Sequence, residues 1–197
     1  PGDNVECQFQ IAGSTGDCRT SDNSIIDFQS VYGSIDPNDI LAYPHGNGSS
    51  HFISNKQAIT YRIRFQNVGN YLTDNVLITD AIPAGFDINS IKNVMGSHPY
   101  QMSVEGRRLS FLFSNINLPD SGSNMEGSNG YIQFTIDQLN SNKGGTIIPN
   151  EASITFDYNE AMITNKVFHT VINENIEAEK HTLSLVPNPC SASTFGS

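Results

Sequence analysis

Tryptophan is absent from this 197-residue sequence, and charged side chains are scarce. Asp, Glu, Lys and Arg make up 15% of the chain, against about 25% in a typical globular domain. Asn, Ser, Thr and Gly fill the difference, and Ile, Val, Thr, Phe and Tyr recur in short runs. This composition is typical of loop-rich extracellular β proteins and disfavours a helical fold. The missing tryptophan also removes the preferred aromatic platform for stacking sugars.

Basic side chains are the second deficit. Ten Lys and Arg residues face 20 Asp and Glu residues, which gives a formal net charge of −10. Such a surface repels phosphate backbones, so nucleic-acid binding is not expected. It also disfavours anionic membrane surfaces. Divalent cations suit it, because a cation relieves the repulsion between clustered carboxylates.

Cysteine is limited to three positions: Cys7, Cys18 and Cys190. Cys7 and Cys18 are close enough in sequence to close a short loop as a disulfide, which would fit an oxidising, extracellular setting. The alternative is two unrelated thiols. Cys190 is left over, and no Cys/His spacing indicates zinc.

Long apolar runs and catalytic motifs are missing too. No segment is long enough to predict a transmembrane helix, and no signal peptide stands at Pro1. If the protein is exported, we expect this chain to be an internal or C-terminal part of a longer precursor. No nucleophile-elbow, zinc-protease or paired-carboxylate motif is present, so the sequence does not predict an enzyme.

Short alternating segments predict strands. Residues 59–67 alternate apolar and polar side chains with a period of two, as a half-buried strand requires. Gly69 and Asn70 follow as turn residues. The other predicted strands are 28–35, 75–80, 100–104, 109–113, 131–136, 152–156 and 163–172. Roughly eight or nine short strands with turns between them predict an all-β, immunoglobulin-like antiparallel β-sandwich with a short N-terminal extension.

Four segments divide the chain. Residues 1–27 are polar and irregular apart from an alternating stretch at 5–11, and we interpret them as an N-terminal extension or the end of a preceding domain. Residues 28–173 hold the predicted sandwich. The Glu-rich residues 174–182 indicate a linker. Residues 183–197 begin a new apolar pattern that is cut short, as the start of a C-terminal domain would be. Short helical segments are expected only near 89–92 and 173–180.

Two motifs resemble a known family. Residues 58–69 (AITYRIRFQNVG), followed by 75–85 (NVLITDAIPAG), are similar to the conserved-repeat (DUF11-like) immunoglobulin-like β-sandwich domains of bacterial surface proteins. Further matches follow in order at 106–113 and 150–154. The resemblance implies a structural module of a surface protein. The turn chemistry of Asn67, Gly69 and the Pro83–Gly85 segment explains the motif without a catalytic role.

Three further motifs resemble the Bacteroidetes variant of this module. They are GSIDPND at 33–39, INLPDS at 116–121 and the segment 154–165 ending in ITN. In that variant a lysine usually follows the first motif, whereas Ile40 stands here. Any ion pair of that lysine is therefore absent from this chain.

The C-terminal segment resembles the start of a type A sorting domain of type IX secretion. Residues 183–189 (LSLVPNP) combine a hydrophobic strand with the PNP motif that often opens such domains. The motif is short, but its position directly after the module strengthens the resemblance. The resemblance implies export to an extracellular or outer-membrane location.

Calcium is the chemistry that the loops favour most. Ca²⁺ requires six to eight oxygen ligands, usually including several carboxylates. Loops at one end of a sandwich could bring such oxygens together, although none matches an EF-hand. The alternative is that these are ordinary turns and Asx caps. The predicted ligands are Asp36, Asn38 and Asp39 in one loop and Asp120, Asn124 and Glu126 in another, with 157–160 as a third oxygen-rich loop.

An intramolecular isopeptide bond is a weaker alternative. Such bonds in Gram-positive surface sandwiches need a buried lysine, an asparagine and a carboxylate. The order of the candidates in this chain fits those families poorly; they are Lys56, Lys166, Asn165 and Glu151.

Function is therefore predicted as a non-catalytic surface module, either a spacer or stalk or an adhesion domain, whose partners are neighbouring domains of its own polypeptide. The alternative is a glycan- or protein-binding module that uses its end loops, with or without calcium. Sugar stacking would need exposed tyrosines, and the candidates are Tyr43, Tyr71, Tyr100 and Tyr158. Neither nucleic-acid binding nor membrane insertion is expected.

Overall fold

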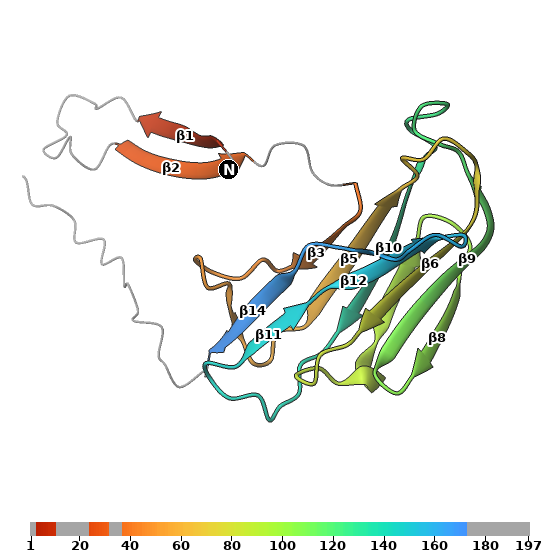
Figure 1. Cartoon of the computed structure of the whole chain (residues 1–197). Helices are drawn as coiled ribbons and strands as arrows, with labels where there is room; N and C mark the ends of the chain where they lie inside the picture. Colours follow the sequence, from red (N-terminus) through yellow and green to blue (C-terminus); the bar gives the residue numbers. More distant parts are fainter. Residues whose placement is uncertain (1–2, 11–23, 32–36, 173–197) are drawn as a thin grey trace, which may run out of the picture. The chain divides into compact units, whose positions relative to one another are not determined.

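The computed structural model describes residues 3–10, 24–31 and 37–172, and the chain divides into two compact units. In one unit, β1 (Asp3–Gln10) pairs antiparallel with β2 (Ser24–Val31). β1 contains most of the alternating stretch predicted at 5–11. β2 contains part of the strand predicted at 28–35, and residues 32–36 lie outside the described residues. The other unit spans Asp36–Glu177 and holds the sandwich (Figure 1).

One layer of the sandwich is a four-stranded antiparallel sheet in the order β3-β5-β10-β7. With β3 as strand A, β5 as B, β7 as D and β10 as E, this is the A-B-E-D order of an immunoglobulin fold. Its strands are β3 (Asp39–Tyr43), β5 (Ile59–Gln66), β10 (Asn129–Ile136) and β7 (Lys92–Gly96).

The facing layer is a five-stranded antiparallel sheet in the order β13-β12-β6-β9-β8. β12 lies beside β6, as strand F lies beside strand C in the immunoglobulin fold. The β8–β9 hairpin is inserted between the strands equivalent to D and E and widens this sheet. Its strands are β13 (Met162–Ile163), β12 (Ala152–Phe156), β6 (Thr73–Ala81), β9 (Arg108–Leu118) and β8 (Gln101–Glu105).

A third, three-stranded sheet has the order β11-β14-β4. It contains β11 (Ile147–Asn150), β14 (Val167–Ile172) and β4 (Phe52–Ser54). β14 pairs antiparallel with β11 and parallel with β4. The single strand predicted at 163–172 is therefore divided between two sheets as β13 and β14.

The core lies between the two large sheets. The alternation predicted for β5 is confirmed, because Ile59, Tyr61, Ile63 and Phe65 are all buried. Phenylalanine side chains of β9 and β10 complete the layer; the Phe111 and Phe134 ring centroids lie 5.9 Å apart. Burial of these apolar side chains away from water supplies the main driving force for folding.

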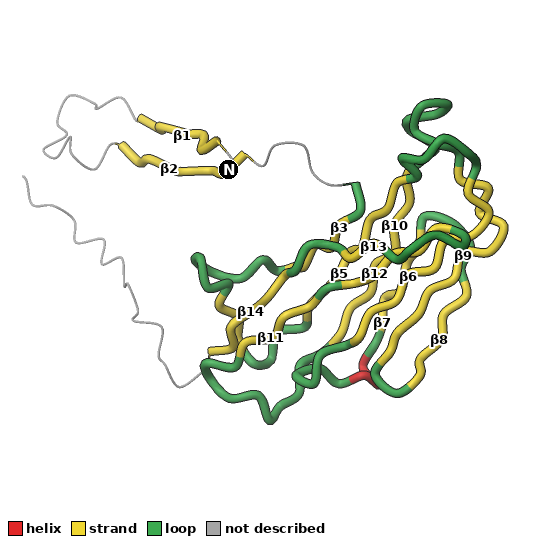
Figure 2. The backbone as a smooth tube through the Cα atoms, in the orientation of Figure 1, coloured by secondary structure: helices red, strands yellow, loops and turns green. Residues whose placement is uncertain are grey.

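Strands and loops make up nearly all of the described chain (Figure 2). The single helical turn among the described residues is the 3₁₀ helix η2 (Ile88–Ser90), capped by the Asp87 carboxylate, which accepts a hydrogen bond from the Asn89 amide. It overlaps the helical segment expected near 89–92, while 173–180 lies outside the described residues. Within the described chain, no helix has the length and apolar character needed to cross a bilayer.

Candidate functional site

Three connections meet at one end of the sandwich, which we call the loop end. They are 67–72 between β5 and β6, 119–128 between β9 and β10, and 157–161 between β12 and β13. Their convergence follows from the strand register, in which Gln66 faces Asn129 and Thr73 faces Leu118. In immunoglobulin domains, loops at one end of the sandwich form the binding surface.

Buried Asn67 fixes the first loop. Its side-chain amide nitrogen donates to the Tyr71 carbonyl at 2.7 Å and to the Leu118 carbonyl at 3.0 Å, while Oδ1 accepts from the Gly69 amide at 3.0 Å. Its backbone amide donates to the Ser128 carbonyl at 2.9 Å. Loops 67–72 and 119–128 are thereby held together, so the surface they present is preorganised.

Asp157 fixes the third loop. Its carboxylate accepts hydrogen bonds from the backbone amides of Asp74 and Asn75, the shortest at 2.7 Å. Its own backbone has φ +50°, a left-handed conformation that Asp tolerates better than most residues. The carboxylate thus anchors loop 157–161 to the start of β6.

Large apolar side chains project from the loop end. Tyr158 is fully exposed and Tyr71 is 78% exposed. Beside them lies a hollow of about 160 Å³ whose lining includes Val68, Phe156 and Met162. Exposed apolar side chains gathered on preorganised loops are typical of an interaction surface. The other exposed apolar residues of this end are Leu72 and Met125.

The four tyrosines considered for sugar stacking fall into two groups. Tyr71 and Tyr158 lie exposed at the loop end, and Tyr43 is 42% exposed at the end of β3. Tyr100 is half-buried against the Phe111 ring and donates its hydroxyl to the Val94 carbonyl. The expectation of exposure is therefore wrong for Tyr100, because its ring packs on the core.

The first loop predicted to bind calcium also lies at the loop end, although Asp36 lies outside the described residues. The side-chain oxygen of Asn38 accepts from the Gln66 amide at 3.1 Å. Asp39 is buried, and both of its carboxylate oxygens accept hydrogen bonds from the Arg64 guanidinium, with Nε to Oδ1 at 2.7 Å. Arg64 therefore already neutralises the carboxylate that calcium would need.

The second loop predicted to bind calcium folds as a turn. The Asp120 carboxylate accepts from the backbone amide of Ser123 at 2.9 Å and from its hydroxyl at 2.7 Å. These bonds lower the pKa of Asp120, because they stabilise the charged form. Oδ1 of Asn124 accepts from the Gly127 amide, and Glu126 is exposed.

Gln66 connects the two predicted calcium loops. Its backbone amide binds Asn38, and its side-chain amide donates to the Ser128 hydroxyl at 2.8 Å. The loops thus share one end of the sandwich. Among the described residues, no three His, Cys, Asp or Glu side chains gather closely enough to hold a metal ion. The calcium site stays a prediction.

The predicted Cys7–Cys18 disulfide also stays a prediction. Cys7 belongs to β1, opposite Asp27. Cys18 and Cys190 lie outside the described residues.

The candidates for an isopeptide bond do not form a buried cluster. Lys166 and Glu151 form an exposed ion pair at 3.3 Å. The side-chain amide of Asn165 instead binds the backbone of Ile40, accepting from its N–H at 2.9 Å and donating to its carbonyl at 3.1 Å. Ile40 itself is fully buried. Asn165 therefore joins the β13–β14 connection to β3 by two hydrogen bonds.

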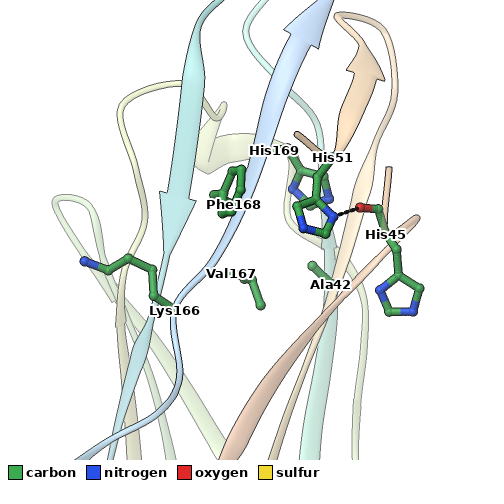
Figure 3. A pocket seen from close by; sticks show the side chains of 7 residues that line it. All are labelled: Ala42, His45, His51, Lys166, Val167, Phe168 and His169. Atoms are coloured by element: carbon green, nitrogen blue, oxygen red, sulfur yellow. Dashed lines mark hydrogen bonds between the residues drawn. The ribbon is translucent and has the colours of Figure 1, made fainter. Parts of the chain in front are cut away.

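A second candidate site is a hollow of about 120 Å³ beside β14, lined in part by three histidines (Figure 3). Nδ1 of His51 lies 2.7 Å from the His45 carbonyl oxygen, and the His45 ring points away from the other two rings. Nε2 of His169 lies 2.8 Å from the Pro44 carbonyl oxygen. Each carbonyl fixes a hydrogen on the nearby nitrogen, so the second ring nitrogen is the unprotonated one in the neutral form.

His169 is the titratable group of this hollow that the fold constrains most. The residue is 1% exposed, and its Nδ1 is buried without a hydrogen-bond partner. Burial lowers the pKa of His169, the Pro44 carbonyl opposes that shift, and nearby His51 and His45 add to the lowering. The fold therefore favours the neutral imidazole, and sequence patterning gave no indication of the contact with Pro44.

Asp80 forms a third unusual site, within the core. The residue is fully buried; Oδ2 accepts from the Asn150 side-chain amide at 3.0 Å, and Oδ1 has no partner. Burial raises the pKa of Asp80 to about 7, which the Asn150 hydrogen bond partly offsets. The Tyr61 hydroxyl is also unpartnered, and burial followed by the Asp80 charge raises the pKa of Tyr61. The strand predicted at 75–80 would end at Asp80, whereas β6 continues to Ala81 and Asp80 is buried.

A family model described as "Domain of unknown function (DUF7619)" matches residues 36–170. No curated protein matches the chain.

Solved structures with a similar fold include domains of bacterial surface proteins. The N-terminal domain of the Streptococcus gordonii adhesin Sgo0707 superposes with a TM-score of 0.52 at 16% identity, covering 76% of this chain and 35% of that chain. The Bacillus cereus major pilin subunit BcpA gives a TM-score of 0.48 at 14% identity, covering 86% and 48%. The collagen-binding domain of a Staphylococcus aureus adhesin gives 0.41 at 14% identity, covering 72% and 100%. The similarity to the Sgo0707 domain shows the fold, and this chain spans about a third of that structure.

Proposed function

This chain belongs to the family described as domain of unknown function DUF7619, and from that premise we propose that its sandwich is a non-catalytic spacer in an exported bacterial surface protein. The observation that carries the proposal is where the chain enters and leaves the module. β3 begins at the loop end, where Asp39 faces Arg64. β14 ends at the other end, where Ile172 lies beside Ser54.

Neighbouring domains would therefore be attached at opposite ends of the sandwich. Figure 1 follows this path from the start of β3 to the end of β14. Such a module adds its own length between the domains that flank it, as a stalk requires. A module whose chain ends lay together would instead sit to one side of its neighbours.

Composition and fold agree with this role. The low charge density and loop-rich surface are typical of extracellular β proteins, and the adhesin domain of similar fold comes from a bacterial surface protein. The resemblance of residues 183–189 to a sorting domain supports export to the outer-membrane surface or the medium. In this proposal the partners are the adjoining domains of the same polypeptide.

Binding of a protein or glycan is the second candidate function. The observation that favours it is the gathering of exposed Tyr71 and Tyr158 on the preorganised loop end. Tyrosine supplies a large contact area at a small cost in conformational entropy, which suits either kind of partner.

Replacement of the module in the full-length protein separates the two functions. Residues 37–172 would be exchanged for an unrelated β-sandwich whose chain ends also lie at opposite ends, and surface display and cell adhesion would be measured. A spacer predicts that the exchange preserves both, whereas deletion impairs them. Loss of adhesion in both the exchanged protein and the Tyr71→Ser/Tyr158→Ser variant would reject the spacer and support binding.

A further inference from the structure

The loop end combines its apolar side chains with negative charge. Among the described residues, the basic side chains nearest to it are Arg64, which is bonded to Asp39, and Arg62, whose guanidinium lies 4.1 Å from the centroid of the Tyr131 ring. The exposed apolar groups therefore stand in a negative potential. The other carboxylates of this end are Asp74, Asp120, Glu126, Asp157 and Glu160.

The opposite end of the sandwich has the reverse character. It is formed by the connections 55–58, 82–91, 106–107 and 137–146, which hydrogen bonds join; for example, the Gln138 side chain donates to the carbonyls of Ser54 and Gln57. Its carboxylates are Asp87, Glu105 and Asp137, and Asp137 is paired with Lys92 at 2.7 Å. Glu151, which lines a hollow together with Arg108, is paired with Lys166 at 3.3 Å. Its basic side chains are Lys56, Lys92, Arg107, Arg108 and Lys143.

Two of the basic groups at this opposite end, Arg107 and Lys92, are held by hydrogen bonds. The Arg107 guanidinium donates to the carbonyls of Ile82, Pro83 and Phe86, with Nε to Ile82 at 2.8 Å. Arg108 begins β9, and Lys143 lies exposed in the 137–146 connection. Positive charge is thus fixed at the end where β14 leaves the module.

We infer that the loop end binds the opposite end of a second copy of this chain, so that copies associate end to end. Charge complementarity identifies the occupant, because the acidic, apolar end and the basic end are two surfaces of one molecule. The contact uses different patches on the two partners, so it is heterologous and can be repeated along a row. The inference concerns association between molecules and does not depend on the spacer proposal.

Ionic strength and substitution test the inference together. Sedimentation velocity of the whole chain would be measured over a concentration series at about 10 mM and about 1 M salt, where the Debye lengths are about 30 Å and about 3 Å. We expect association at low salt that weakens at least tenfold at high salt. Tyr158→Ser and Lys143→Glu alter exposed side chains at opposite ends, and each is expected to weaken association at least fivefold.

Charge reversal supplies the decisive control. Glu160→Lys and Lys143→Glu should each associate weakly alone, and their mixture should regain association because the reversed ends are complementary. Ser103→Glu, an exposed change on edge strand β8, should leave association unchanged.

Three results would overturn the inference. One is a monomer at every concentration in low salt. Another is association that survives Tyr158→Ser and Lys143→Glu but is lost in Ser103→Glu, which would assign the contact to the β8 edge. The last is a mixture of the reversed variants that stays as weak as each alone.

Discussion

At the scale of single residues, Asp80 is the clearest departure from a simple apolar core. An unfolded Asp has a pKa near 3.9, whereas burial raises the pKa of Asp80 to about 7 in the folded chain. The folded state therefore holds a proton that the unfolded state has lost between these values. Its contribution to stability is complete below about pH 4 and is lost as the pH rises through about 7.

Asp80→Asn should remove this pH dependence. Asn keeps the shape and can still accept the Asn150 hydrogen bond, but it never becomes a buried charge. We expect the free energy of unfolding of the wild type to fall by up to about 1.4 kcal/mol per pH unit between pH 4 and 7 relative to the variant. Urea unfolding at several pH values measures this. Asp74→Asn, an exposed control, should follow the wild type, and parallel wild-type and Asp80→Asn profiles would contradict the argument.

His169 gives the opposite pH dependence. Its pKa is lowered in the folded state, so its neutral form contributes stability above the ordinary histidine pKa near 6.5 that is lost as the pH falls. In His169→Gln, the side-chain amide can still donate to the Pro44 carbonyl, and the imidazolium can no longer form. We expect this variant to lose less thermal stability than the wild type between pH 7 and 5.

His98→Gln is the matched control for His169, because His98 lies outside the hollow and bonds its neighbour Ser97. Hydrogen exchange of the β4 and β14 amides at the two pH values localises the effect. If the wild type and His169→Gln lose the same stability on acidification, protonation of His169 is not the cause.

At the scale of elements, single side chains join segments that are distant in sequence. Asn165 binds both backbone groups of Ile40, and Asn67 binds the carbonyls of Tyr71 and Leu118. Amide side chains can do this because they carry a donor and an acceptor, as a backbone peptide does. Asn165 therefore holds the edge strand β3, and Asn67 holds loop 67–72, at positions where the hydrogen bonds between paired strands end.

Asn67→Ala should loosen the loop end. The substitution leaves the Leu118 and Tyr71 carbonyls and the Gly69 amide without their partner, and we expect it to cost about 1–3 kcal/mol of unfolding free energy. Chemical denaturation measures the cost, and hydrogen exchange should rise in 67–72 and 119–128. Asn70→Ala, at an exposed position of the same loop, should have a far smaller effect. An unchanged midpoint in Asn67→Ala would show that the loops are held by other contacts.

At the scale of the whole molecule, Asp80 and His169 give opposing pH dependences of stability, which offset each other just below the ordinary histidine pKa near 6.5. The Asp80 contribution declines as the pH rises, and the His169 contribution declines as the pH falls. The two groups lie in different parts of the sandwich, so their effects should be nearly additive.

Calcium tests the loop end as a whole. The carboxylates of Asp39 and Asp120 already accept hydrogen bonds from protein donors. Thermal unfolding would be compared in about 2 mM CaCl₂, a concentration suited to weak extracellular sites, and in EDTA. Coinciding curves would show that these loops are ordinary turns. A rise of several degrees in calcium that disappears in Asp120→Asn would instead establish the predicted calcium site.

The sequence by itself determined the fold class and much of the core. The alternation at 59–67 could be read directly because side chains of a strand point to opposite faces in turn, and the strands predicted at 75–80, 109–113, 131–136 and 152–156 lie within β6, β9, β10 and β12. Strands β3, β4, β7 and β11 were not predicted, because they are short and lack a clear period. The sequence also identified the loops that gather at one end, although not which of their side chains are already bonded.

Only the tertiary structure decided what the polar residues do. Asp80 is the last residue of the strand predicted at 75–80, yet the register of β6 places its carboxylate in the core. His169 and Asn165 each bond a partner 125 positions away in sequence. The separation of charge between the two ends likewise depends on how the connections are distributed. No local sequence pattern indicates these contacts, because the partners are brought together by the pairing of distant strands.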